Sequence, residues 1–134
     1  MRLSLAEQLM HSTVRLECES KNGNESTATG FFFQFKTDEG NFIPLIITNK
    51  HVIKDAEKGT FVLTRKNSDG TPSIGAYERV SFKVDFEKAW LKHSDPSVDL
   101  AAFPLAPLLK LAEKINFVPF FISFDESSLA TPES

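Results

Sequence analysis

Two residues of this chain could act together as a general base and its partner. His51 follows an apolar run at residues 45–47 and a short polar link, and Asp99 comes directly before the apolar run 100–105. A carboxylate that accepts one ring N–H of a histidine fixes its tautomer and leaves the other nitrogen free to take a proton. Residues 48 positions apart can meet at the rim of a barrel if each lies at the end of a strand. We therefore expect His51 and Asp99 to lie together as a base and its orienting acid.

The other ionisable residues near this pair have simpler interpretations. Asp95, in the sequence Asp-Pro-Ser, is interpreted as a turn former that bonds nearby backbone N–H groups. Asp99 could instead be a strand-entry residue that bonds such groups. Asp55 follows the histidine by four positions and is an alternative partner for it. His11 and His93, at a helix end and in a turn, are expected to face solvent without a functional role.

The elements that must position the pair are short strands joined by turns. Alternating or continuously apolar segments predict six strands, at residues 12–19, 28–37, 42–48, 60–66, 79–86 and 98–105. Gly, Asn, Asp and Pro separate them, and residues 51–59 are expected to contain one helical turn closed by a glycine. The predicted fold is all-β, a six-stranded antiparallel barrel or a small sandwich.

Two short helices are expected to flank the strands. Ser4 and Glu7 have the spacing of a capping box, which predicts a helix over residues 4–11 with Leu5 and Leu9 turned inward. Apolar spacing predicts a second helix over residues 106–115.

Apolar side chains are assigned to the core from the alternation within strands. Val14, Leu16 and Cys18 share one face of the first strand, so the only cysteine is expected to fill core space. The stripe Phe31, Phe33 and Phe35 is likewise interpreted as barrel core rather than a ligand cage.

Composition narrows the classes of function. A chain of 134 residues with net charge −3 predicts one domain without a basic face for nucleic acid. It has no apolar run long enough for a membrane helix or a secretory leader, and its single cysteine favours a reducing compartment, so a cytoplasmic location without membrane contact is expected. A phosphate-binding glycine loop and a Cys/His metal motif are both missing from the sequence, so no cofactor or metal is expected.

Three segments give the chain a resemblance to a known family. In order, "TATGFFFQF", "LIITNKHVI" and "SDPSVDLAAFPL" resemble the first half of a trypsin-like (chymotrypsin-fold) serine peptidase of the bacterial type. The resemblance implies that His51 is the triad base and Asp99 the orienting acid. It also implies an N-terminal helix at 1–11, the first barrel at 12–105 and, at 106–134, the truncated start of the connection to a second barrel. Val52 stands where secreted trypsins have cysteine, and an Ile-Val-Gly-Gly start is missing, so activation by that route is not expected.

The family's nucleophile is missing from the sequence. The six glycines stand at 23, 30, 40, 59, 70 and 75, and none begins Gly-x-Ser-Gly or Gly-x-Cys-Gly. The chain alone is therefore expected to be inactive, and a complete enzyme would cleave a peptide or protein substrate through an acyl-enzyme. Alternatives are a non-enzymatic barrel that binds a protein partner and one chain of a split peptidase. Either a second barrel or self-association is expected to cover an exposed apolar patch of four phenylalanines: Phe103, Phe117, Phe120 and Phe121.

Overall fold

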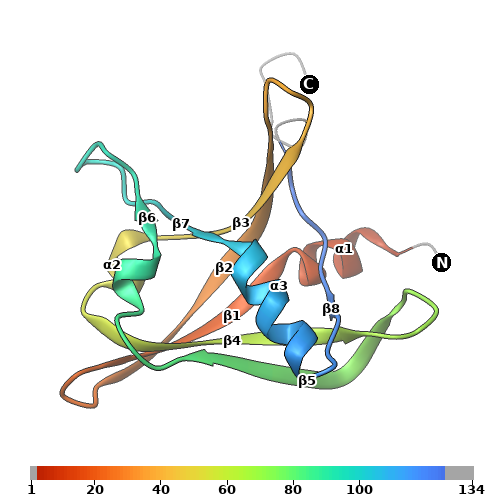
Figure 1. Ribbon diagram of the computed structural model, residues 1–134, viewed down its shortest axis with the longest axis horizontal. Coiled ribbons are helices and arrows are strands. Elements are labelled where there is room, and N and C mark those ends of the chain that lie inside the picture. The colour runs from red at the N-terminus through yellow and green to blue at the C-terminus, as the bar shows by residue number, and fades with distance from the viewer. Residues whose placement is uncertain (1–2, 126–134) are drawn as a thin grey trace.

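The computed structural model describes residues 3–125 and is built mainly of antiparallel strands (Figure 1). In this part of the chain the strands are β1 (Thr13–Ser20), β2 (Glu25–Lys36), β3 (Phe42–Thr48), β4 (Ala56–Lys66), β5 (Pro72–Phe82), β6 (Leu91–Lys92), β7 (Ala101–Pro104) and β8 (Pro119–Phe120). The helices are α1 (Leu5–His11), α2 (Lys50–Ile53), α3 (Leu105–Lys114) and a 3-10 turn, η1 (Glu87–Ala89). No helix within residues 3–125 is both long enough and apolar enough to cross a membrane.

The strands form one sheet in the order β5-β4-β1-β2-β3-β7-β6, and β8 pairs with β4. The segment β4-β1-β2-β3 has the 4-1-2-3 order of a Greek key. The predicted all-β class is thus confirmed, with eight described strands instead of six. The two extra strands, β6 and β8, have two residues each, which is too short for a periodic signal. The described pairings end at β5 and β6 without a bond that closes the sheet.

The core lies between the sheet and α3, and aromatic rings fill its centre. Phe61 of β4 is fully buried, and its ring lies 5.6 Å from that of Phe86, 6.2 Å from that of Trp90 and 4.9 Å from that of Phe103. The predicted inward face of β1 is confirmed, with these members buried: Val14, Leu16 and Cys18.

The predicted core face of β2 is wrong. Phe31 and Phe35 are 48% and 43% exposed, whereas Phe32 between them is 3% exposed. Gly30 explains the inversion: it is buried, and a Cβ there would lie 2.9 Å from Cγ2 of Ile46. Because side chains alternate along a strand, an inward position 30 makes 32 inward and 31 outward.

Helix α1 forms as predicted, but the face that was predicted to be buried is exposed. The capping box is present, because the Ser4 hydroxyl accepts from the Glu7 backbone N–H and Glu7 accepts from that of Ser4. Leu5 and Leu9 are 72% and 51% exposed, so their predicted inward orientation is wrong. His11, expected to face solvent, is instead 5% exposed. The helix meets the body through its last turn, and the backbone N–H of residue 122 donates to the carbonyl oxygen of His11 (3.0 Å).

The predicted exposed phenylalanine patch is also wrong. Two of its members are buried and two are half-buried, in the order Phe103, Phe117, Phe120 and Phe121. α3 returns over the sheet and buries Leu108 and Ala112, so the chain following it also packs inward. The guanidinium of Arg65 lies 4.9 Å from the centre of the Phe117 ring.

The link between β3 and β4 is tighter than predicted. α2 ends at Ile53, and β4 already begins at Ala56, so Gly59 lies inside a strand and does not close a helix. Gly59 is needed there because the ring of Phe86 packs directly against its Cα position.

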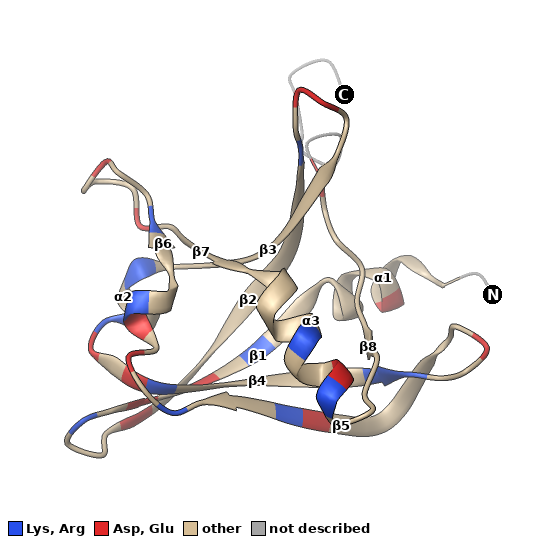
Figure 2. Cartoon of the chain, in the orientation of Figure 1, with Lys and Arg blue, Asp and Glu red and all other residues tan. Residues whose placement is uncertain are grey.

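Basic and acidic residues are interspersed along β1, β4 and β5 (Figure 2).

Candidate functional site

His51 lies in the first turn of α2, directly after β3. Thr48, the last residue of β3, is 4% exposed, and its hydroxyl donates to the carbonyl oxygen of Thr29 at 3.1 Å. Asn49 then adopts an extended backbone as the residue before the helix. The end of the strand is thus fixed in the sheet, and the chain turns there to present the histidine at the surface.

Asp99 reaches the same place through the pairing of β7 with β3. The two strands are antiparallel, and Thr48, at the end of β3, pairs with Ala101, at the start of β7. Residues just after β3 and just before β7 therefore lie side by side. The register of this pair of strands brings together two residues that are 48 positions apart.

The two side chains make a two-point contact. Nδ1 of His51 lies 2.5 Å from Oδ2 of Asp99, and the backbone N–H of His51 donates to Oδ1 at 3.1 Å. The hydrogen bond with the imidazole is the main reason that the pKa of Asp99 lies below its ordinary value. The contact orients the imidazole with Nε2 directed away from the carboxylate. Within residues 3–125, Nε2 has no hydrogen-bond partner, and the His51 side chain is 71% exposed.

Two further contacts hold the Asp99 loop against α2. The side-chain amide of Asn49 donates to the backbone carbonyl of Asp99 at 2.8 Å, and Nζ of Lys50 donates to that of Asp95 at 3.1 Å. Asp95 closes its own turn, because its carboxylate accepts the backbone N–H of Ser97 at 2.9 Å and the Ser97 hydroxyl at 2.8 Å. Its predicted role as a turn former is confirmed.

The remaining predicted residues lie apart from the pair. Asp55 uses its backbone N–H to donate to Glu87 (2.9 Å) and makes no hydrogen bond with His51. His93 is exposed as predicted, and its Nδ1 accepts from the backbone N–H of Asp95. The sequence indicated only a short polar link before His51, in which Asn49 and Lys50 had no individual role. The only signal was that two residues able to donate hydrogen bonds directly precede the histidine.

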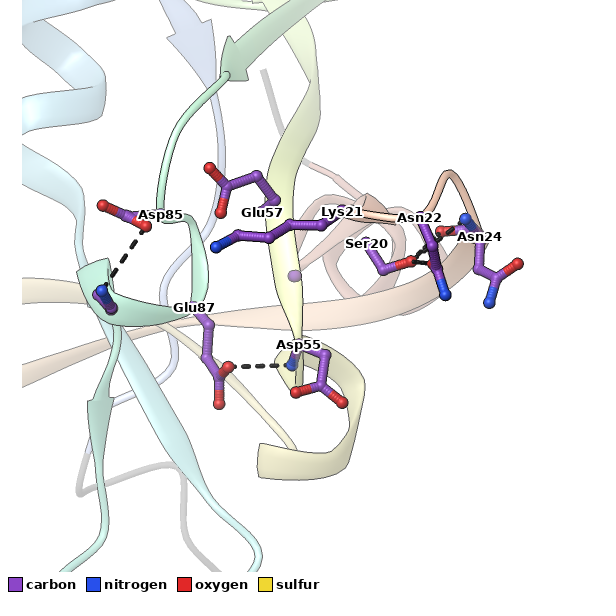
Figure 3. Close-up of a pocket in the computed structure, with 10 residues that line it drawn as sticks. Ser20, Lys21, Asn22, Asn24, Asp55, Glu57, Asp85 and Glu87 are labelled. Atoms are coloured by element: carbon purple, nitrogen blue, oxygen red, sulfur yellow. Dashed lines mark hydrogen bonds and ion pairs between the residues drawn. The ribbon is translucent and has the colours of Figure 1, made fainter.

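A polar pocket of about 490 Å³ lies beyond α2 (Figure 3). Its acidic lining residues are Asp55, Glu57, Asp85 and Glu87, and its basic ones are Lys21 and Lys88. Figure 3 shows Lys21 extending among the carboxylates. Glu87 accepts from Lys92 and from the backbone of Asp55, and its pKa is lowered mainly by the Lys92 contact. Residues 3–125 contain no group of three His, Cys, Asp or Glu side chains placed to hold a metal ion.

Comparison with known proteins adds no family assignment. No protein-family model, curated protein or solved structure matches this chain.

Proposed function

We propose that this chain is the first barrel of a bacterial-type, cytoplasmic, trypsin-like serine peptidase. His51 is its general base and Asp99 the acid that orients it. The serine nucleophile is supplied by a second barrel, either in the same polypeptide or in another chain. The observation that carries the proposal is the two-point contact, in which both oxygens of Asp99 bind His51 and Nε2 stays exposed.

The proposed chemistry follows from which nitrogen is free. With the proton on Nδ1 bound by Asp99, Nε2 takes the proton of the serine hydroxyl as the serine oxygen attacks the peptide carbonyl. The ionised Asp99 stabilises the imidazolium that forms. Nε2 then protonates the leaving amine, the peptide C–N bond breaks, and an acyl-enzyme remains. Water, activated by the same nitrogen, hydrolyses that ester and restores the serine. No cofactor enters any step.

The topology is consistent with the first barrel of the proposed fold. Each of the six longer strands, β1 to β5 and β7, overlaps one predicted strand, although β5 spans Pro72–Phe82 and not 79–86. They contain a Greek key. The base lies at the end of β3 and the acid before β7, which are neighbours only because the sheet order departs from the sequence order.

A second candidate function is a non-enzymatic module that binds a protein partner. It is favoured by the outer face of the β2–β3 hairpin, which extends away from the rest of the sheet (Figure 1). Phe35 and Ile43 pair across this hairpin and are 43% and 48% exposed, and Phe31 on the same face is 48% exposed. Exposed apolar side chains on one face are typical of interaction surfaces. The same face is available for self-association.

A serine-directed fluorophosphonate tests the peptidase proposal on the natural gene product that carries this chain, purified through a tag. We expect the probe to label a serine in that product or in a chain that copurifies with it. His51→Ala should lower turnover by roughly 10⁶-fold and Asp99→Asn by roughly 10⁴-fold, and both should abolish labelling. The matched control is His93→Ala, another exposed histidine, which should leave labelling unchanged.

The outcomes separate the candidates. A folded product that is never labelled, or whose labelling persists in His51→Ala, refutes the peptidase and leaves the binding module. The 134-residue chain alone should hydrolyse neither casein nor activated esters. Steady hydrolysis by that chain, lost in His51→Ala, would show that it contains its own nucleophile and would refute the division of the triad proposed above.

A further inference from the structure

A second candidate site lies on the outer face of the sheet, at the end where α1 is found. It is a groove of about 570 Å³, a volume inside the roughly 300–1,000 Å³ typical of ligand sites. Its floor is formed by outward side chains of three adjacent strands, Arg15 of β1, Val62 of β4, and Tyr77 and Arg79 of β5. They point outward because their strand neighbours Leu16, Phe61 and Val80 are in the core.

The walls of the groove come from α1 and from a bulge in β5. Met10, near the end of α1, forms one wall, and Ile74 and Gly75 form the other. The pairing of β5 with β4 shifts between Thr64 and Arg65, which leaves residues 74–76 of β5 without partners. Gly75 has φ of 84°, a left-handed conformation that favours glycine. The bulge leaves Ile74 70% exposed beside the groove.

Three large apolar side chains line the groove and are exposed. Met10, Ile74 and Tyr77 are 54%, 70% and 63% exposed, although all three line the same groove. Contiguous exposed side chains of this kind mark sites at which another molecule removes them from water.

The groove also carries an excess of positive charge. Arg15 and Arg79 both bind the single carboxylate of Glu17, each through one nitrogen. Partial burial would raise the pKa of Glu17, but the hydrogen bonds from the two arginines outweigh it, and the pKa lies below its ordinary value. Two guanidinium groups therefore share one negative charge, and each keeps N–H donors without a partner among the described residues. Guanidinium groups bind carboxylates by paired, charge-assisted hydrogen bonds.

We propose that this groove binds a short extended peptide segment that has apolar side chains and one carboxylate. The apolar side chains pack on Met10, Ile74 and Tyr77, and the carboxylate binds the free donors of Arg15 and Arg79. A peptide fits better than a compact molecule because the floor crosses three strands.

This site is separate from the proposed catalytic pair. Figure 1 shows α2, which carries His51, and α1, which borders the groove, on opposite sides of the molecule. None of the residues that line the groove contacts His51 or Asp99. The proposal therefore stands whether or not the chain belongs to a peptidase, and it describes a docking site and not a substrate cleft.

Selection from a random heptapeptide library displayed on phage tests the proposal. The folded 134-residue chain is the target, and the double variant Ile74→Ser, Arg79→Gln is used to remove peptides that bind elsewhere. We expect enriched peptides to combine apolar residues with Asp or Glu. One enriched peptide is then synthesised with its acidic residue intact and with that residue changed to the amide, and both are measured by fluorescence anisotropy.

The acidic peptide should bind the wild-type chain about tenfold more tightly than its amide form, since a charged hydrogen bond is lost. Arg79→Gln, or Arg15→Gln, should remove that difference and leave the affinity of the amide form within about twofold. Ile74→Ser should weaken both peptides about fivefold. The matched controls lie outside the groove: Ile115→Ser, which is the same change at a 51% exposed isoleucine, and Lys88→Gln, which removes one positive charge.

Three results would overturn the proposal. One is a selection that enriches no peptide relative to the double variant. Another is equal affinity for the acidic and amide peptides in the wild-type chain, a comparison that does not depend on any variant folding correctly. In the third, no peptide binds, but anilinonaphthalene sulfonate, a small aromatic anion, binds the wild-type chain and is weakened by Arg79→Gln. That result would indicate that the groove binds a small molecule.

Discussion

Gly59→Ala should strongly destabilise the chain because of the ring that covers this position. A Cβ added at residue 59 would lie 2.1 to 2.4 Å from three carbons of the Phe86 ring. Phe86 is fully buried, and its ring is bounded by Phe61 at 5.6 Å, Trp90 at 5.8 Å and Phe103 at 6.1 Å. The ring therefore cannot move away from β4 without displacing its aromatic neighbours.

The size of the effect follows from this packing. Adding a methyl group to a filled core costs typically about 1–3 kcal/mol, and a contact near 2 Å against a confined ring belongs at the upper end. Retreat of Phe86 would also strain its backbone hydrogen bond to the carbonyl of Glu57, which is 3.1 Å long. A loss of about 3 kcal/mol in a domain of this size corresponds to a melting temperature lower by roughly 10 °C.

Thermal unfolding followed by circular dichroism measures the effect, with urea unfolding as a second estimate. Phe86→Leu is the rescue variant, because leucine lacks Cε2 and Cζ, two of the three ring carbons that a new Cβ would meet. In the Phe86→Leu background, Gly59→Ala should cost less than about half of what it costs in the wild type. A single variant that melts within about 2 °C of the wild type, or an equal cost in both backgrounds, would refute the packing argument.

Three further predictions concern the candidate site. The carboxyl carbon of Asp99, followed by NMR, should titrate below the ordinary value of about 3.9, and His51→Ala should return the midpoint toward it, whereas His93→Ala should not. Because its folded pKa is lowered, Asp99 stabilises the chain fully above its unfolded pKa and loses that contribution as the pH falls through the folded pKa. The stability difference between the wild type and Asp99→Asn should therefore shrink on acidification, and a difference that grows would contradict it. Asn49→Ala removes the bond to the Asp99 carbonyl and should raise the Asp99 midpoint toward that of His51→Ala, and an unchanged midpoint would show that this bond does not position the acid.

The contact between His51 and Asp99 could be predicted because two local patterns fixed it. Each residue borders a short apolar run that polar or turn residues interrupt, and such interruptions indicate that a strand ends nearby. The supporting bond from Asn49 could not be predicted in the same way. Its amide reaches a backbone carbonyl of Asp99, and any residue type offers a carbonyl, so the acceptor leaves no trace in the sequence.

The orientation of β2 could not be read from its residues. Positions 31, 32, 33 and 35 are all phenylalanine, so both faces of the strand are apolar and alternation does not distinguish them. The face is decided by a tertiary contact, the close approach of Ile46 to Gly30. The predicted orientation of α1 was wrong for a related reason. Its apolar residues suggested burial, but only its last turn contacts the rest of the protein.

Because the pair is exposed, the second barrel of the proposed peptidase must cover it and exclude water from it. The His51 and Asp99 side chains are 71% and 47% exposed, and contacts between exposed ionisable groups contribute little in water. The same contact orients and stabilises an imidazolium far more effectively where water is excluded and the effective dielectric constant is lower. If water were not excluded, a serine near Nε2 would therefore face an imidazole that is well oriented but whose protonated form Asp99 stabilises only weakly. In the proposed peptidase, the second barrel must therefore bring both the nucleophile and a surface that closes over α2 and the Asp99 loop.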